Sequence, residues 1–455
     1  MSEGPRFALD AAVRRRSGGR LLVGGTPPRL LRLSEAGGRA LDAILAGDRD
    51  PDTAAMALAH RLERHGILHP LPGDGSDDPE VTAIVPVLDG GDRLLALVAT
   101  LAAEGPVIVV DDGSRDGSGA VAERAGARVL RHDLPRGPAA ARNAGLAAAT
   151  TELVVFLDAD CEVEPGWRRG LARLFARDRD LTLVGPRVRS APGDSPLARY
   201  EQAGSPLDLG PHASLVGPER RVAYLPAAAL LGRRDHLVEV GGFDESMRFG
   251  EDVDLVWRLL ATGRRVRYEP SREVSHRPRA TVVAFARQRA GYGSSAPGLV
   301  RRHGASAAPL RVGRHTAVIG VATALLGPRA LIPALAASTA IVARRGVDRP
   351  SREALAQVSL RGQADAAARL ARALCREWLP LALAAAPFSR RARRALAVAV
   401  AIDALPAWSR CRTPEDLLRT TALHALDRSA YAAGMWRELI RSGEPQALMP
   451  RRSPP

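Results

Sequence analysis

The middle of the chain alternates short apolar runs with longer segments of helical spacing. Apolar runs of strand type lie at residues 81–87, 107–110 and 153–157, and residues 128–131 form a short further strand. Segments with helical spacing follow the first three strands in chain order, at residues 93–103, 119–125 and 139–148. This alternation predicts an α/β, Rossmann-like fold with a mostly parallel sheet covered by helices on both faces. Ligands of such open sheets bind at the carboxyl ends of the strands.

The pattern before residue 71 predicts a small separate module. Its expected elements are a strand hairpin at 20–23 and 29–34, a helix at 35–45 and a helix at 52–65. Ser34 is placed to cap the first helix, and Gly47 is placed to end it. This order of elements predicts a winged-helix-like module. Residues 72–80 are rich in Gly, Pro and Asp and predict a linker.

The pattern after residue 302 is rich in Ala, Leu and Arg and predicts helices up to a frayed tail at 450–455. Its longest apolar stretch, 316–343, is interrupted by Gly327, Pro328 and Arg329. Neither half reaches the roughly 18 uninterrupted apolar residues that a spanning helix needs. We expect helices packed within the protein, with contact to a membrane surface as the alternative. The predicted domains are therefore 1–71, the linker 72–80, 81–302 and 303–455.

The charge of the chain comes from arginine alone. The 455 residues include 65 basic and 50 acidic side chains, a net charge of +15, and none of the basic residues is lysine. Without lysine, Schiff-base catalysis and a Walker-A phosphate loop are excluded. Abundant Arg, Ala, Gly and Pro are typical of GC-rich coding, so we expect no nucleic-acid partner. The positive charge favours smaller anionic partners such as diphosphates, or an acidic membrane surface.

The three cysteines, Cys161, Cys375 and Cys411, are far apart and lack metal-ligand spacing. The first nineteen residues hold no apolar core of the signal-peptide type. Both features favour a reducing, cytoplasmic location. Peripheral contact with the inner face of the membrane is the alternative.

Acidic residues follow two of the predicted strands. Asp111 and Asp112 come after the second strand, and Asp158 and Asp160 come after the fourth. Carboxylates at the ends of strands in one sheet converge on the same crevice. There they suit a divalent cation that is shared with substrate phosphates. The alternative is that these acids only form turns and cap helices.

Six segments in this order resemble family-two glycosyltransferases of the GT-A fold. They are residues 81–87, 109–114, 137–145, 156–160, 241–245 and 250–255, and the resemblance covers roughly 81–290. It implies that Pro86, Asp111, Asp112, Arg142 and Asp158 bind a nucleotide-sugar donor. It implies that Asp160 and His276 hold a divalent metal, Mn²⁺ or Mg²⁺. It also implies that Asp252 is the general base and that Asp244 and Glu251 lie on the acceptor side.

The chemistry of an inverting transfer agrees with these roles. One carboxylate can take the proton of the attacking hydroxyl, and a metal can stabilise the leaving diphosphate. For Asp252 the alternative is an acid that favours the start of a helix at 253–261. His276 can equally be a structural histidine. Four following arginines can clamp a diphosphate or form a solvated basic face: Arg277, Arg279, Arg287 and Arg289. The stretch Gln288 to Tyr292 departs from the Gln-x-x-Arg-Trp pattern of processive synthases, which disfavours polymer extrusion.

The N-terminal module resembles the small recognition domains that bind leader peptides in pathways that modify ribosomally made peptides. A packing module without a ligand and a DNA-binding winged helix are the alternatives, and helix 52–65 is too weakly basic to favour the latter. The whole architecture resembles the glycosyltransferases of mycofactocin biosynthesis. That resemblance implies β-linked glucose transfer to a peptide-derived redox cofactor precursor or its peptide.

Two other functions remain open at this stage. One is transfer to a polyprenyl phosphate or glycolipid, which the apolar C-terminal region would serve. The other is a sugar nucleotidyltransferase or a non-catalytic peptide-binding scaffold. A nucleotidyltransferase of related fold usually has a Gly-rich loop with Arg and Lys after its first strand. The turn at 88–92 has no lysine, which counts against that activity.

Overall fold

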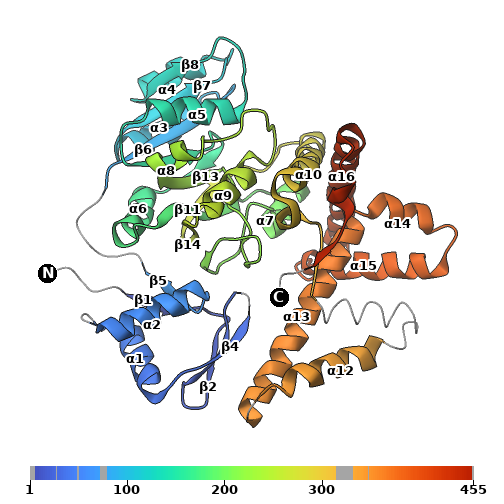
Figure 1. Ribbon diagram of the computed structural model, residues 1–455. Coiled ribbons are helices and arrows are strands. Elements are labelled where there is room, and N and C mark those ends of the chain that lie inside the picture. Colours follow the sequence, from blue (N-terminus) through green and yellow to red (C-terminus); the bar gives the residue numbers. More distant parts are fainter. Residues whose placement is uncertain are drawn as a thin grey trace. The chain divides into compact units, whose positions relative to one another are not determined.

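The computed structural model, shown as a ribbon in Figure 1, describes residues 6–26, 28–48, 51–71, 79–313, 331–346 and 348–452. Most of the predicted linker, at 72–78, lies outside the described residues, as does the end of the tail at 453–455. The chain forms two compact units. The first combines residues 1–11 with 41–280, and the second combines 12–40 with 281–455. The domain boundaries drawn from the sequence stay a prediction.

The first unit is built on a nine-stranded sheet with the order β10-β14-β11-β13-β9-β6-β7-β8, and β12 also pairs with β14. Its strands are β6 (Val81–Val87), β7 (Val107–Asp111), β8 (Arg128–Arg131), β9 (Leu153–Leu157), β10 (Cys161–Glu162), β11 (Leu181–Ser190), β12 (Ser214–Leu215), β13 (Ala229–Arg233) and β14 (Arg265–His276). The four predicted strands are β6 to β9, and all pairs among them are parallel. The predicted α/β fold with a mostly parallel sheet is confirmed.

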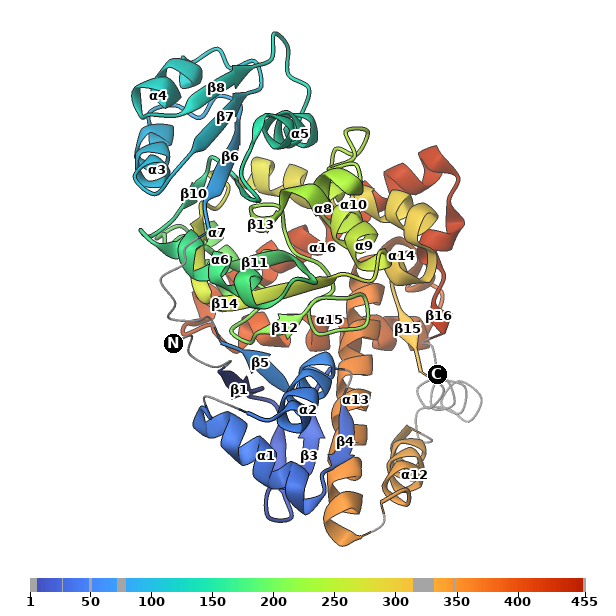
Figure 2. The same cartoon turned by 60° about the vertical axis from the view of Figure 1, so that its left-hand side comes forward.

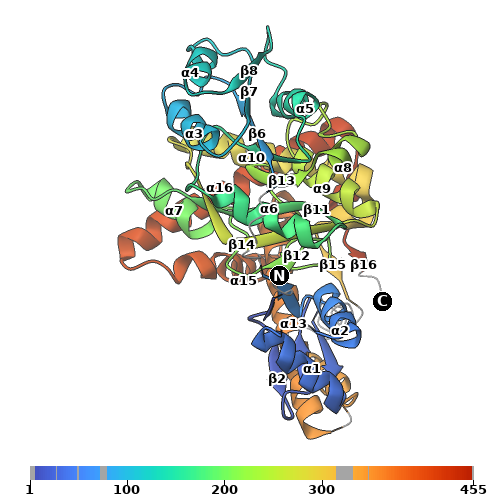
Figure 3. The same cartoon turned by 90° about the vertical axis from the view of Figure 1, so that its left-hand side faces the viewer.

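Helices cover both faces of the parallel strands. The helices of this sheet are α3 (Arg93–Ala102), α4 (Ser118–Arg124), α5 (Pro138–Ala148), α6 (Trp167–Arg177), α7 (Pro196–Gly204), α8 (Arg234–Glu239) and α9 (Glu251–Ala261). In Figure 2, α3 and α4 lie on one side of β6 to β8 and α5 lies on the other. Figure 3 shows α6 lying across β11 and β14. Because both faces are covered, β6, β7 and β9 are almost entirely buried and read as continuous apolar runs.

The other half of the sheet was not predicted. β13 lies antiparallel between β9 and β11, and β14 pairs in parallel with β11. The last residue of β14, His276, lies opposite Cys161 in β10, which follows the turn after β9. This register brings the end of a distant strand to the turn that carries Asp158 and Asp160.

The predicted N-terminal elements are present. In the first unit β1 (Phe7–Leu9) pairs antiparallel with β5 (Leu68–Pro70), and α2 (Thr53–Arg64) belongs to the same unit. In the second unit β2 (Arg14–Arg16), β3 (Leu21–Gly24) and β4 (Arg29–Arg32) form an antiparallel sheet. α1 (Glu35–Ala46) begins after Ser34, whose hydroxyl accepts the Gly37 N–H at 3.1 Å, as expected of a cap.

The rest of the second unit is helical, as predicted. Its helices are α10 (Val282–His303), α12 (Leu331–Ala343), α13 (Arg349–Cys375), α14 (Leu379–Ala385), α15 (Arg390–Trp408) and α16 (Pro414–Ser442), with 3₁₀ turns η1 (Gly304–Ala307) and η3 (Pro445–Leu448) and short strands β15 (Arg311–Val312) and β16 (Arg451–Arg452). β3 and β4 lie against α13 (Figure 2). Of the apolar stretch 316–343, residues 316–330 lie outside the described residues. Among the helices of the described ranges, none has the length and apolarity needed to cross a membrane.

Candidate active site

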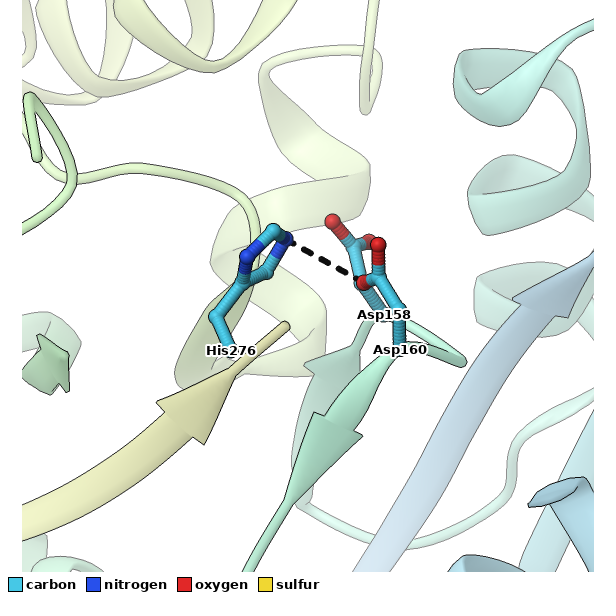
Figure 4. A group of neighbouring side chains, drawn as sticks. All are labelled: Asp158, Asp160 and His276. Atoms are coloured by element: carbon cyan, nitrogen blue, oxygen red, sulfur yellow. Dashed lines mark ion pairs between the residues drawn. The ribbon is translucent and has the colours of Figure 1, made fainter. Parts of the chain in front are cut away.

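Two carboxylates and an imidazole converge at the end of β9. Asp158, Asp160 and His276 each offer one ligand atom, and these atoms lie within 4.8 Å of one another (Figure 4). His276 Nε2 lies 3.2 Å from an oxygen of Asp160. The structure therefore brings together Asp160 and His276, the two residues expected to hold a metal, and adds Asp158 to them.

The topology explains why these three residues meet. In the parallel half of the sheet the strand order is β8-β7-β6-β9, so the direction of winding reverses between β6 and β9. Crevices at such switch points are where open α/β sheets bind ligands. Asp158 directly follows β9, and its N–H donates to the Ala228 carbonyl at 3.1 Å, just before β13 begins. His276 then arrives at the end of β14.

Asp160 is held in its ionised form by its neighbours. Burial alone opposes ionisation, but the hydrogen bond and charge of His276, together with Arg279, lower the pKa of Asp160. Arg279 lies 3.5 Å from the second Asp160 oxygen. Burial also opposes a charged His276, but Asp160 and Asp158 outweigh it and raise the pKa of His276. The negative charge of Asp160 is thus met in this structure by His276 and Arg279.

The donor set fits a divalent metal ion. Two carboxylate oxygens suit Mg²⁺ and Mn²⁺, while an imidazole nitrogen is a ligand more typical of transition metals. Three protein ligands on one side leave room for phosphate oxygens or water on the other. Asp158, Asp160 and His276 are therefore the residues that would hold the metal.

Arg142 joins Asp158 to Glu251. Its guanidinium donates to Asp158 at 2.7 Å and to Glu251 at 3.0 Å, and it lies 5.3 Å from the centre of the Phe243 ring. Arg142 is only 3% exposed, so this guanidinium is held inside the protein. Burial disfavours its charge, but the two carboxylates more than compensate and raise the pKa of Arg142. This geometry makes Arg142 a link between α5, the turn after β9 and the start of α9.

Asp252, the expected general base, lies in the first turn of α9. One of its oxygens accepts the Val253 N–H at 2.8 Å, and the other accepts the Ala227 N–H at 3.2 Å. Burial raises the pKa of Asp252 despite these hydrogen bonds. Burial, followed by the charge of Asp252, raises the pKa of Glu251 to about 7. A carboxyl with a raised pKa is better suited to accept a proton at neutral pH than an ordinary aspartate.

One short segment that the sequence analysis missed connects these groups. The Ala227 N–H donates to Asp252, and the neighbouring Ala228 carbonyl accepts from the Asp158 N–H. The segment therefore sets the spacing between Asp158 and Asp252. Its contribution comes from backbone groups, which every residue has, so no side-chain pattern could have identified it.

The acids after β7 shape the loop that follows. Asp111 is fully buried, pairs with Arg131 and accepts the Ser114 N–H at 2.7 Å. Asp112 accepts the N–H groups of Arg136 and Gly137 at 2.9 and 2.8 Å and lies 2.7 Å from His132 Nδ1. Pro86 is half-buried in β6, in the same sheet. That these three residues contact a nucleotide stays a prediction.

The remaining predicted residues lie in varied surroundings. Asp244 accepts from the N–H and hydroxyl of Ser246 at 2.8 and 2.6 Å, which is a local turn. Of the four arginines considered as clamps, Arg277 pairs with Glu162 and Arg279 with Asp160. Arg289 belongs to the second unit, where it lies 3.4 Å from Asp427.

Comparison with known proteins gives the family of the chain. The family model described as glycosyl transferase family 2 matches residues 82–233. The pre-mycofactocin glycosyltransferase of Mycobacterium tuberculosis is 38% identical over 99% of this chain and 98% of its own length. The succinoglycan biosynthesis protein ExoO of Rhizobium meliloti is 32% identical over 42% of this chain and 59% of its own length.

A solved structure of a mannosyltransferase from Pyrobaculum calidifontis, in complex with GDP-Man and Mn²⁺, is 19% identical and covers 75% of this chain and 90% of its own, with a TM-score of 0.41. The structural similarity to the mannosyltransferase is low. The sequence identity to the mycobacterial protein, in contrast, extends over almost the whole chain. This sequence identity and the family match across β6 to β13 together assign the chain to a family. The chain belongs to glycosyl transferase family 2 and is a glycosyltransferase of the GT-A fold.

Proposed function

We propose that the enzyme transfers a sugar, with inversion and in a metal-dependent reaction, from a nucleotide-sugar donor to a peptide-derived redox cofactor precursor. The observation that supports this most directly is the meeting of Asp158, Asp160 and His276 beside the segment that also fixes Asp252. The full-length identity to a protein named pre-mycofactocin glycosyltransferase supports this acceptor. The resemblance to that group is also the basis for proposing β-linked glucose as the product.

The residues divide the proposed reaction between them. Asp252 accepts the proton of the acceptor hydroxyl as its oxygen attacks the anomeric carbon, and Glu251 and Asp244 lie on the acceptor side. Asp158, with Pro86, Asp111 and Asp112, lines the nucleotide side. Arg142 positions Asp158 and Glu251 rather than meeting the donor directly, because its guanidinium is buried and already donates to both carboxylates. A bound Mn²⁺ or Mg²⁺ would act as a Lewis acid that stabilises the charge on the departing diphosphate.

The metal site is tested with Asp160→Asn. We expect calorimetric titration to show at least tenfold weaker Mn²⁺ binding in the presence of a nucleoside diphosphate, since an amide oxygen carries no charge. Sugar transfer, measured by mass spectrometry with several donors, should decrease together with Mn²⁺ binding. Glu162→Gln is the matched control, because Glu162 is exposed and pairs with Arg277. If Asp160→Asn keeps both Mn²⁺ binding and transfer, this metal site is refuted.

A polyprenyl phosphate or glycolipid is the second acceptor that we consider. The observation that favours it is the exposed apolar surface of α14 and α15 in the second unit, including Leu381, Leu383 and Val398. Mass spectrometry of products separates the two acceptors, since a sugar added to a lipid phosphate and one added to a peptide-derived precursor give different masses. For location, we propose the cytoplasm with peripheral contact to the membrane.

A further inference from the structure

Helices α14 and α15 form a hairpin with an unusual surface. They run side by side, and the loop that joins them contains Phe388 (Figure 1, orange). Between Glu377 and Asp403 the sequence contains no acidic residue, although it contains four arginines at 390, 391, 393 and 394. The exposed large apolar residues of the hairpin are Leu381, Leu383, Phe388, Val398, Val400, Ile402 and Leu405. The hairpin therefore combines an exposed apolar surface with a cluster of positive charge.

The inner side of α15 is already packed. Ala399 is buried against Ala371 and Cys375 of α13. Asp403 bonds to His424 at 3.0 Å and to Arg428 at 2.7 Å, which ties α15 to α16. Among the described residues of this unit, α15 therefore already has a packed face, and its exposed apolar residues are additional to that face.

The outer side of α15 forms a stripe. Val398, Ile402 and Leu405 are spaced i, i+4 and i+7, so they lie on one face of the helix. Phe388 is 91% exposed at the tip of the hairpin. Proteins rarely expose large apolar patches without a binding role. Such a patch next to a cationic cluster suits a surface that is both apolar and anionic.

We propose that the α14–α15 hairpin docks on an anionic phospholipid surface, with Leu381, Leu383 and Phe388 entering the boundary between headgroups and acyl chains. Arg390, Arg391 and Arg394 then face lipid phosphates. Across the described part of the second unit these three arginines have no ion pair, whereas Arg393 donates to the carbonyls of Ala386 and Pro387. Charge complementarity favours an anionic membrane over a second copy of the protein. Two copies joined through this face would bring two arginine clusters together.

The dimensions of the hairpin fit shallow insertion. With seven residues in α14, this helix is about 10 Å long at a rise of about 1.5 Å per residue. Interfacial segments bury their apolar side to about 5–10 Å. The hairpin would therefore lie in the interface. This proposal does not depend on which sugar or acceptor the enzyme uses.

Flotation with lipid vesicles tests the proposal on the full-length protein. We expect binding to phosphatidylcholine vesicles that contain about one third phosphatidylglycerol, and little binding to phosphatidylcholine alone. Arg390→Gln with Arg391→Gln should weaken binding by about 30-fold, since each arginine near an anionic surface contributes roughly fivefold. Phe388→Ser should weaken it by roughly tenfold, because a large apolar side chain is no longer inserted.

Matched controls remove the same chemistry elsewhere in the second unit. Arg410→Gln with Arg412→Gln changes the same charge just beyond α15, and Leu418→Ser removes an apolar residue that is 72% exposed on α16. Both controls should bind vesicles like the parent protein. Circular dichroism and gel filtration show whether every variant stays folded. The proposal is overturned if the hairpin variants bind vesicles as well as the parent protein, or if the parent protein does not bind anionic vesicles. Self-association of the protein that Phe388→Ser abolishes would also overturn it.

Discussion

At the scale of residues, the site depends on a buried arginine that pairs with two carboxylates. Arg142 has two carboxylate partners, Asp158 and Glu251, at 2.7 and 3.0 Å. A buried arginine with two acids costs less than an isolated buried charge, because each group compensates the desolvation of the others. Sequence reasoning placed Arg142 near the nucleotide. The structure shows that its guanidinium is engaged with the protein, so a positioning role is the simpler account.

Replacement of Asp252 separates catalysis from binding. Asp252→Asn keeps the shape and the contact with the Ala227 N–H but cannot accept a proton at neutral pH. We expect transfer to fall by about 100-fold to 10,000-fold. Donor binding, measured by calorimetry, should change by less than about threefold. A comparable loss of donor binding would assign Asp252 to the metal site.

The raised pKa values of Glu251 and Asp252 predict a pH dependence. Burial and the charge of Asp252 raise the pKa of Glu251 to about 7, and burial raises the pKa of Asp252. A general base must be deprotonated, so kcat/KM should be constant at high pH and fall on acidification, as the coupled pair of carboxyls takes up a proton. Glu251→Gln removes one negative charge, so Asp252 should ionise more easily and the fall should move to lower pH. The profile is measured with saturating Mn²⁺, and an unchanged midpoint in Glu251→Gln would contradict the coupling.

At the scale of elements, the packing of α10 against α16 relies on two glycines. A Cβ atom on Gly434 would lie 1.8 Å from the Ala290 carbonyl oxygen, and one on Gly293 would lie 2.0 Å from the Tyr431 carbonyl oxygen. The two helices therefore approach each other closely, as Figure 1 shows. No side chain fits at either position without moving a helix backbone.

Gly434→Ala tests this close packing. Because the clash is with backbone, we expect a loss of about 3 kcal/mol in the free energy of unfolding. Denaturant titration followed by circular dichroism measures it. Gly362→Ala is the control, because Gly362 lies within α13 and a Cβ there meets nothing within 4 Å. The control should be neutral or slightly stabilising, since alanine favours the helix. An equal change in unfolding free energy in the two variants would contradict the close packing of α10 against α16.

The elements also show which strands a sequence can reveal. Three buried parallel strands appear as apolar runs between helices, and the shorter β8 as an apolar pair between two arginines, so β6 to β9 could be predicted. β13 and β14 could not be placed in the same way. β14 contains Glu269, Arg272 and Glu273 among its twelve residues, and these charged residues interrupt the apolar pattern. Its pairing with β10, which delivers His276 to the site, depends on residues more than a hundred positions away.

At the scale of the whole molecule, β1 and β5 are tied into the unit that carries the active site. Asp10 is 4% exposed, lies 2.8 Å from His69 Nε2 and accepts from Arg221 at 2.6 Å. Arg267 also donates to the Pro70 carbonyl at 2.9 Å. Residues 6–10 and 68–70 therefore share polar contacts with the rest of the unit that carries the active site.

Asp10→Ala tests this connection. It leaves His69 and Arg221 without their carboxylate, so we expect a loss of about 3 kcal/mol in unfolding free energy. Thermal unfolding with and without a nucleoside diphosphate shows whether the nucleotide-binding unit is the part that loses stability. Glu80→Ala is the control, because Glu80 is an exposed acid that lies just before β6. If both variants unfold at the parent temperature, the N-terminal contacts do not stabilise this unit.

The sequence by itself determined the reaction class and half of the sheet. Periodicity predicts buried strands, and acids at strand ends predict where chemistry occurs, because both depend on local spacing. Six ordered segments then fixed the family. What only the tertiary structure decided is which groups touch. The Asp158, Asp160 and His276 cluster, the Arg142 link and the Ala227 N–H all require strands that are distant in sequence to pair in one register. That register is set by packing of the whole sheet, which no local pattern encodes.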